Sequence, residues 1–226
     1  MKVLLVGPAR LTLEEQKYAT FPNGLLSMAA VLEKHGHEVK IYDGNIDVKQ
    51  PADFVDFAPG IIGFTVASGP KITDAIVLSQ EFKQLIPAAS LIWGGTHPSV
   101  LPEQTLIEPY IDFIAIGAGE YTLLELVEHL ETGATRLEDI KGLVFKQDGK
   151  IIRNEPRPFI EDLDELPNPA WHLVDVSKYW ATSLNTSRGC PFKCTYCITP
   201  DSTTVTGPTC RYPVSSARYN ISSRIT

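Results

Sequence analysis

The chain has 226 residues, of which 20 are basic and 27 acidic, so its formal charge at pH 7 is −7. At about 150 residues per domain, this length allows one complete domain and part of a second. It excludes a complete (β/α)₈ barrel of about 250 residues joined to anything else. The acidic balance argues against a general binder of nucleic acid or of an anionic membrane.

The lengths of the apolar runs and the positions of the cysteines indicate the cellular compartment of the protein. No apolar run reaches the length of about 18 residues that a membrane-spanning helix needs, and the apolar run 3–6 is too short for a secretory signal. All four cysteines lie between positions 190 and 210. A disulfide framework usually spreads its cysteines over the fold, whereas clustered thiols favour a metal or cluster site. The sequence therefore predicts a cytoplasmic protein with no membrane partner.

Short apolar runs alternate with amphipathic stretches through the first 130 residues. The apolar runs predict buried strands at 2–6, 39–42, 61–66, 90–93 and 113–116. Helical periodicity predicts helices over 23–36, 73–85 and 121–130. Apolar strands separated by helices imply a parallel sheet that is covered on both faces. The expected fold class is α/β, a flavodoxin-like or Rossmann-like doubly wound sheet over residues 1–140.

The pattern changes in residues 141–180. Residues 143–152 predict a β-hairpin that turns at Asp148-Gly149. The acidic, proline-rich stretch that follows predicts an extended connection between domains. Its aromatic residues Trp171, Tyr179 and Trp180 indicate that the connection packs onto the rest of the protein. A last strand, over 182–187, is expected to lead into the cysteines.

Three cysteines, Cys190, Cys194 and Cys197, have the spacing C-x₃-C-x₂-C. Three thiolates so close in sequence can bind three irons of a [4Fe–4S] cluster. Since no fourth cysteine lies in the same tight loop, one iron stays open, as metals do in catalytic sites. The alternative is a zinc site with Cys210 as fourth ligand, although zinc sites usually pair their cysteines in C-x₂₋₄-C knuckles.

With its flanking residues, the segment from Ser187 to Cys197 resembles the signature of the radical S-adenosylmethionine (radical SAM) family. The resemblance implies that Cys190, Cys194 and Cys197 hold the cluster, that its open iron binds S-adenosylmethionine (SAM), and that Tyr196 lies near that cofactor. It implies a reductant such as ferredoxin or flavodoxin. It also implies reductive cleavage of SAM to a 5′-deoxyadenosyl radical, for methylation, cyclisation or rearrangement of an unidentified small molecule.

Glycine loops after the predicted strands resemble the cobalamin (B12)-binding domain that precedes many radical SAM cores. Such loops lie at the carboxyl ends of parallel strands, where α/β sheets bind ligands. Glycines there allow close approach of a nucleotide-like tail, and helix N-termini can accept its phosphate. The residues that the resemblance assigns to cobalamin are Gly24, Thr65, Gly94, Gly95, His97, Gly117, Gly119 and Glu120.

Two binding motifs are incomplete in this sequence: one that would supply a cobalt ligand and one that would bind a nicotinamide cofactor. Many cobalamin domains supply a cobalt-binding histidine from D-x-H-x-x-G after the first strand, but that region reads Gly7-Pro8-Ala9-Arg10 here, so we expect no such ligand. His97 is expected either near cobalt or, more simply, as a solvated loop residue. A nicotinamide site with Asp43 on the ribose is disfavoured, because Thr122 stands where G-x-G-x-x-G needs its third glycine.

The end of the chain departs from the rest. Residues 201–226 are rich in serine and threonine, lack leucine and show no periodicity, which predicts a poorly ordered tail. We expect residues 181–200 to begin a radical SAM core whose barrel does not follow, in a truncated chain whose last residues come from a shifted reading frame. The alternative functions are a non-catalytic cobalamin- or nucleotide-binding module and a nucleotide-binding oxidoreductase with a Cys₄ zinc site.

Overall fold

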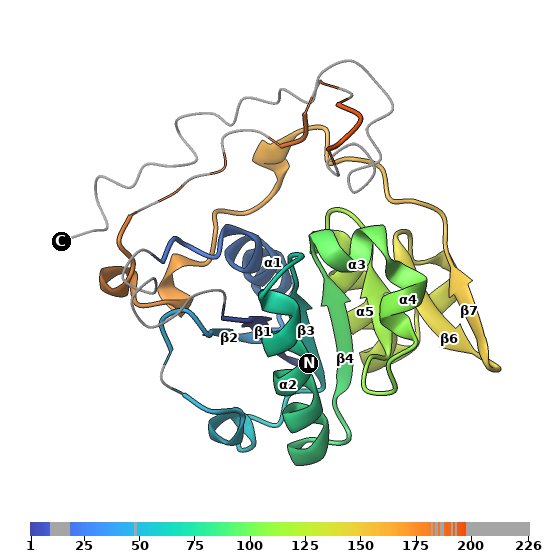
Figure 1. Cartoon of the computed structure of the whole chain (residues 1–226), viewed down its shortest axis with the longest axis horizontal. Helices are drawn as coiled ribbons and strands as arrows, with labels where there is room; N and C mark the ends of the chain where they lie inside the picture. The colour runs from blue at the N-terminus through green and yellow to red at the C-terminus, as the bar shows by residue number, and fades with distance from the viewer. Residues whose placement is uncertain are drawn as a thin grey trace.

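The computed structural model describes residues 1–9, 19–47, 49–181, 183, 185, 188–190, 192 and 194–197. Within these residues a seven-stranded sheet forms the centre, in the order β2-β1-β3-β4-β5-β6-β7 (Figure 1). The strands are β1 (Lys2–Gly7), β2 (Glu38–Asp43), β3 (Ile61–Thr65), β4 (Ser90–Gly94), β5 (Phe113–Ala115), β6 (Leu143–Gln147) and β7 (Lys150–Arg153).

The first five strands are parallel to one another. β1 lies between β2 and β3, so the direction in which strands are added reverses there, and a topological switch point lies beside β1. This is the flavodoxin-like order, and it confirms the predicted doubly wound α/β sheet. All five strands predicted from the apolar runs are present.

Helices cover both faces of the sheet (Figure 1). Alternate residues of β1 show how: Val3 and Leu5 belong to one apolar core, Leu4 and Val6 to the other, and all four are fully buried. The first core contains α1 (Asn23–Lys34) and α5 (Glu120–Thr132), whereas the second contains α2 (Lys71–Leu85) and α4 (Pro102–Leu106), which follows α3 (Thr96–Val100).

The short helices α3 and α4 are absent from the sequence prediction. Each has five residues, too few to show a helical period, and the pair flanks Leu101, where the backbone leaves the helical region. The structure also has short 3₁₀ turns, η2 (Pro51–Phe54), η3 (Leu137–Asp139), η4 (Leu163–Glu165), η5 (Trp171–Leu173) and η6 (Val176–Lys178). None of the described helices is long and apolar enough to cross a membrane.

The predicted hairpin is present as β6 and β7. Asp148 and Gly149 at its turn both have positive φ, 51° and 74°, as a two-residue type I′ turn requires. The hairpin is antiparallel and continues the central sheet, because Phe145 pairs with Phe113 on β5. The division between domains at residue 140 stays a prediction.

After β7 the chain returns across the carboxyl ends of the strands, along the top of the view in Figure 1. We call residues 154–181 the return segment. It packs onto the rest of the protein, as predicted: the amide of Ala170 donates to the carbonyl of Leu26 on α1 at 3.1 Å, and the ring of Phe21, just before α1, lies 5.1 Å from that of Trp171 and 4.7 Å from that of Tyr179. Most of the predicted strand 182–187, Cys210 and the tail 201–226 lie outside the described residues.

Candidate cofactor site

A cavity of about 440 Å³ opens at the carboxyl edge of the sheet. Its volume falls within the range of about 300–1,000 Å³ that is typical of small-molecule sites. Strands β3, β4 and β5 end in its wall, and α1 and α5 begin there. Of the residues that the sequence assigns to cobalamin, seven line this cavity: Gly24, Thr65, Gly94, Gly95, Gly117, Gly119 and Glu120. That each of them contacts a cofactor stays a prediction.

Gly95 brings the loop after β4 close to the backbone of β3. Its φ is +96°, and a Cβ atom there would lie 2.8 Å from the carbonyl oxygen of Val66. Only glycine accepts both conditions without strain. The amide of Val66 in turn donates to the carbonyl of Gly94 at 2.8 Å. At Gly94 and Gly95 the cavity wall is therefore built from backbone.

Ser99 joins the two glycine loops. Its hydroxyl donates to the carbonyl of Gly95 at 2.7 Å and accepts from the amide of Gly117 at 3.1 Å. Ser99 is itself buried and lines the cavity. The sequence prediction missed Ser99, because nothing in the sequence shows that it lies beside Gly117 in the loop after β5.

The remaining walls are mostly apolar. Met28 from α1, Phe64 from β3, Ile92 from β4 and Leu123 from α5 line the cavity with Phe159 of the return segment. The helical residues fit an ordinary core pattern, and Phe159 lies in a proline-rich stretch. Neither context marks a binding residue in the sequence. A glycine edge beside apolar walls fits an extended, partly aromatic group such as the nucleotide-like tail of cobalamin.

Glu120 is the charged residue of this wall that the sequence assigned to cobalamin. Only 4% of its surface is exposed. Its Oε1 accepts from the Ser27 hydroxyl at 2.8 Å and lies 2.6 Å from Nη2 of Arg188. The carboxylate is therefore engaged by the protein itself, and its main partner comes from the segment that leads into the cysteines.

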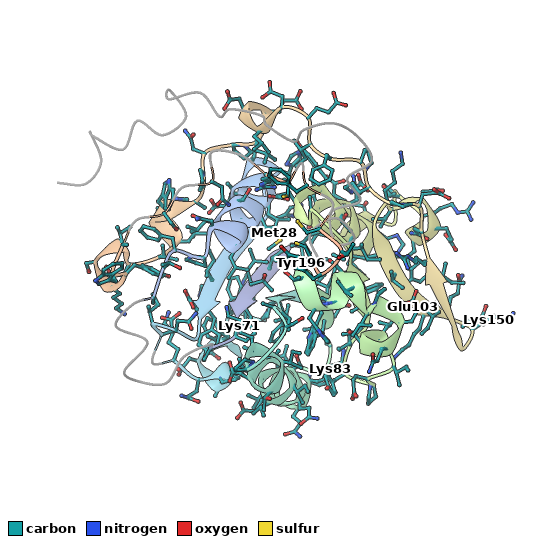
Figure 2. All side chains as sticks on the ribbon, turned by 45° about the horizontal axis from the view of Figure 1, so that its top comes forward. Met28, Lys71, Lys83, Glu103, Lys150 and Tyr196 are labelled. Carbon is teal, nitrogen blue, oxygen red and sulfur yellow. The ribbon has the colours of Figure 1, made fainter. Side chains whose placement is uncertain are left out.

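Two other assigned residues do not line the cavity. His97 is half-buried on α3, where burial lowers the pKa of its imidazole. Tyr196 is 90% exposed. Figure 2, in which the top of Figure 1 comes forward, labels Tyr196 near the centre of the view. A role for Tyr196 near SAM stays a prediction.

Asp43 is not available to a ribose. It is 2% exposed, and its Oδ1 accepts from the amide and the side-chain nitrogen of Asn45 at 3.0 and 2.8 Å. The hydroxyl of Tyr179 donates to its Oδ2 at 3.1 Å. Burial raises the pKa of this carboxyl, and these hydrogen bonds oppose the rise. The residue anchors the return segment, which removes the main support for a nicotinamide site.

The structure describes all three cysteines of the motif. Cys194 is exposed, Cys190 and Cys197 are half-buried, and the amide of Cys197 donates to the carbonyl of Cys194 at 3.0 Å in a turn. Among the residues that the structure describes, no three histidine, cysteine or acidic side chains are gathered as a metal site. The structure thus does not assemble the thiols. Three thiols so close in sequence are nevertheless the donor set that a [4Fe–4S] cluster takes.

Comparison with known proteins agrees with this geometry. Residues 9–127 match the family described as B12 binding domain. An uncharacterized methyltransferase of Pyrococcus horikoshii is 35% identical over 209 residues, which cover 87% of this chain and 45% of that protein. The anaerobic magnesium-protoporphyrin IX monomethyl ester cyclase of a Synechocystis strain is 31% identical over 212 residues, which cover 87% and 42%.

A solved structure shares the fold. That of the cobalamin-dependent S-adenosylmethionine radical enzyme OxsB, with aqua-cobalamin and S-adenosylmethionine bound, matches with a TM-score of 0.74 at 23% identity, over 87% of this chain and 28% of that one. At this identity the likeness shows the fold alone. The chain spans somewhat less than half the length of the two curated relatives above. Because the matched family covers more than half of the chain, the protein belongs to the B12-binding domain family.

Proposed function

We propose that the chain binds cobalamin in the cavity at the carboxyl edge, carries a [4Fe–4S] cluster on Cys190, Cys194 and Cys197, and acts with SAM on a small-molecule substrate by methylation, cyclisation or rearrangement. One observation carries the proposal. The cavity belongs to the B12-binding domain, and its wall also contains Arg188 and Gly189, which immediately precede Cys190.

The residues of the cavity suit the cobalamin role. The loops at Gly94-Gly95 and Gly117 present backbone to the ligand, so a flat or extended group can approach closely. The first turns of α1 and α5 reach the cavity through Gly24 and Gly119, and helix N-termini favour a phosphate group. Met28 and Phe159 supply apolar surface that keeps water from the bound ligand.

The part of the chain from Arg188 to Cys197, which we call the cysteine segment, suits the cluster role. When bound, the cluster and SAM supply one-electron cleavage of the sulfonium and with it a 5′-deoxyadenosyl radical. The chain contributes the three thiolates as ligands and Arg188 as a contact to the cobalamin domain. An external one-electron donor such as ferredoxin or flavodoxin completes the proposal. The substrate class stays open.

A cobalamin titration tests the first part. The Gly24→Leu variant places a large side chain at a residue that lines the cavity, where a Cβ atom has no neighbour within 4 Å. We expect saturable binding of aquacobalamin by the natural chain, followed by its visible spectrum, and loss of binding in the variant. Lys34→Leu, on the exposed far end of the same helix, is the control and should bind normally. Equal affinity in all three proteins would remove the cavity as the site.

Anaerobic reconstitution with iron and sulfide tests the second part. We expect about four irons and four sulfides per chain, as a [4Fe–4S] cluster holds. Cys194→Ala should lose the cluster and Cys210→Ala should keep it. A colourless protein that retains zinc and needs Cys210 would overturn the cluster and support the zinc site.

A further inference from the structure

An ion pair joins the cavity to the cysteine segment. Nη2 of Arg188 lies 2.6 Å from Oε1 of Glu120, and both residues line the cavity. The Glu120 side chain is 4% exposed and that of Arg188 is 24% exposed. The pair therefore connects a position two residues before Cys190 with the first residue of α5.

Ser27 on α1 completes this contact. Its hydroxyl donates to Oε1 of Glu120 at 2.8 Å and accepts from Nη2 of Arg188 at 3.2 Å. Ser27 is 5% exposed. Three polar side chains from α1, α5 and the cysteine segment thus meet at one oxygen. We call Ser27, Glu120 and Arg188 the latch.

The energetics of burial give the latch its strength. A carboxylate as buried as Glu120 is costly unless a charge and hydrogen bonds compensate it. Arg188 supplies the charge, and Ser27 supplies the hydrogen bond. If the cysteine segment moved away from the cavity, Glu120 would keep its place on α5 but lose its cation. The fold therefore favours the arrangement in which the segment lies against the cavity.

A weaker contact involves Ser183, which precedes Arg188 in the sequence. The side-chain nitrogen of Asn23, the first residue of α1, donates to the Ser183 hydroxyl at 2.9 Å. This is a neutral hydrogen bond, which contributes less than a charge-assisted one such as that between Arg188 and Glu120. Position 183 is also farther from the cysteines than Arg188.

We propose that the latch positions the cysteine segment over the cavity, so that Arg188 and Glu120 are positioning residues and Glu120 is not a cobalamin contact. Its purpose, to hold cluster and cobalamin at a fixed separation, rests on the proposed function. The latch itself is a property of the chain and can be measured without either cofactor.

Thiol reactivity reports the latch directly. The full chain, expressed without added iron, is alkylated under reducing conditions, and mass spectrometry follows each cysteine. We expect Glu120→Gln and Arg188→Gln each to raise the alkylation rate of half-buried Cys190 by about tenfold, since breaking a buried charge pair shifts local equilibria by at least that order. Exposed Cys194 should react at an unchanged rate.

Two further variants separate the latch from a general loss of stability. The exchange Glu120→Arg with Arg188→Glu restores opposite charges and should return the Cys190 rate toward that of the natural chain. Glu103→Gln breaks the exposed pair of Glu103 with Arg153 on the hairpin and should leave Cys190 unchanged. Circular dichroism verifies the fold of each variant. If Glu120→Gln does not fold, Arg188→Gln carries the test, because its side chain is partly exposed.

Aquacobalamin affinity distinguishes the two roles of Glu120. The latch predicts that Glu120→Gln and Arg188→Gln weaken binding by a similar factor and that the double variant is no weaker than either. If Glu120→Gln alone weakens binding and Cys190 keeps its natural rate, Glu120 is a ligand contact and the latch is overturned. If the natural chain binds no cobalamin, the proposed function fails, whereas the alkylation rates still decide the latch.

Discussion

At Gly95 the chain takes a conformation that a side chain would obstruct. Its φ of +96° and the approach of Val66 to 2.8 Å of a Cβ position both act against substitution. Gly133, which ends α5, also has positive φ, +68°, but a Cβ atom there has no neighbour within 4 Å. Substitution at Gly133 would therefore meet only the strain of a left-handed backbone, whereas substitution at Gly95 would also meet the backbone of Val66.

This comparison makes a stability prediction. Gly133→Ala should cost about 1–2 kcal/mol, the price of a left-handed backbone for a residue with a Cβ atom. Gly95→Ala should cost clearly more, because the methyl group also displaces the backbone of Val66. Urea unfolding of both variants measures the difference. Equal losses of stability would show that the backbone at Val66 moves aside at no cost, which would contradict the prediction.

A buried hydrogen bond between Tyr179 and Asp43 makes the stability of the fold depend on pH. The buried carboxyl of Asp43 has a raised pKa, so the folded state binds more protons than the unfolded state just above the ordinary value, and its ionisation costs stability as pH rises. The Tyr179 hydroxyl opposes this by donating to the carboxylate. Burial and the neighbouring Asp43 raise the pKa of Tyr179, which keeps the donor protonated.

Tyr179→Phe should therefore be more harmful at neutral than at acidic pH. We expect a loss of about 1–3 kcal/mol near pH 7, the cost of a buried acceptor left without its donor. The loss should shrink toward pH 4, where the carboxyl of Asp43 takes up its proton. Urea unfolding at both pH values measures it. Tyr121→Phe on α5 is the control, since no hydrogen bond of its hydroxyl is found among the described residues, and a pH-independent loss for Tyr179→Phe would contradict the explanation.

At the scale of elements, Arg157 fixes the start of the return segment. Its Nε donates to the Thr122 hydroxyl at 2.8 Å and its Nη1 to Glu125 at 3.0 Å, while Nη2 forms a second contact with the same carboxylate. Thr122 and Glu125 lie in the first turns of α5. Two residues after Arg157, Phe159 reaches the cavity. The position of one wall therefore depends on this contact.

Arg157→Met keeps the apolar stem and removes the charge and donors. We expect a loss of about 1–3 kcal/mol in the free energy of unfolding, because the side chain is 12% exposed and its partner Glu125 is 32% exposed. Arg153→Met on the hairpin is the matched control. Its pair with Glu103 is more than half exposed on both sides, so it should lose no more than about 0.5 kcal/mol. Similar losses in urea unfolding would argue that the return segment is held elsewhere.

At the scale of the whole molecule, the cavity joins segments that are far apart in the sequence. The cavity wall joins the ends of β3, β4 and β5, two helices and the return segment. A ligand that binds only this assembled state stabilises the entire fold by mass action.

Aquacobalamin at about 100 times its dissociation constant should add about 2.7 kcal/mol, which raises the thermal midpoint by roughly 5–10 °C in a chain of this size. The shift should vanish in Gly24→Leu and persist in Lys34→Leu. Scanning calorimetry with and without ligand measures it. An equal shift in both variants would place the ligand outside the cavity.

Much of this architecture follows from local patterns. Apolar runs of four to six residues determined the five parallel strands, because a buried strand is apolar on both faces. Glycines at the ends of the fourth and fifth strands predicted four cavity residues, Gly94, Gly95, Gly117 and Gly119, since the carboxyl ends of parallel strands share one edge. The cysteine spacing determined the cluster hypothesis by itself. By contrast, α3 and α4 are too short for a period, and Met28 is indistinguishable from a core residue.

Other features depended on the tertiary structure alone. Ser27 lies 93 positions from Glu120 and 161 from Arg188, and no periodicity extends over such separations. Asp43 ends the second strand, where a ribose acid could stand, but it accepts a hydrogen bond from Tyr179, 136 positions away. The sequence determined which residues stand at strand ends and at the cysteine loop, because strand, turn and ligand spacing are local properties. Only the folded sheet decided that these ends enclose one cavity and that Glu120 binds Arg188, because side chains from distant segments meet there at the same buried oxygen.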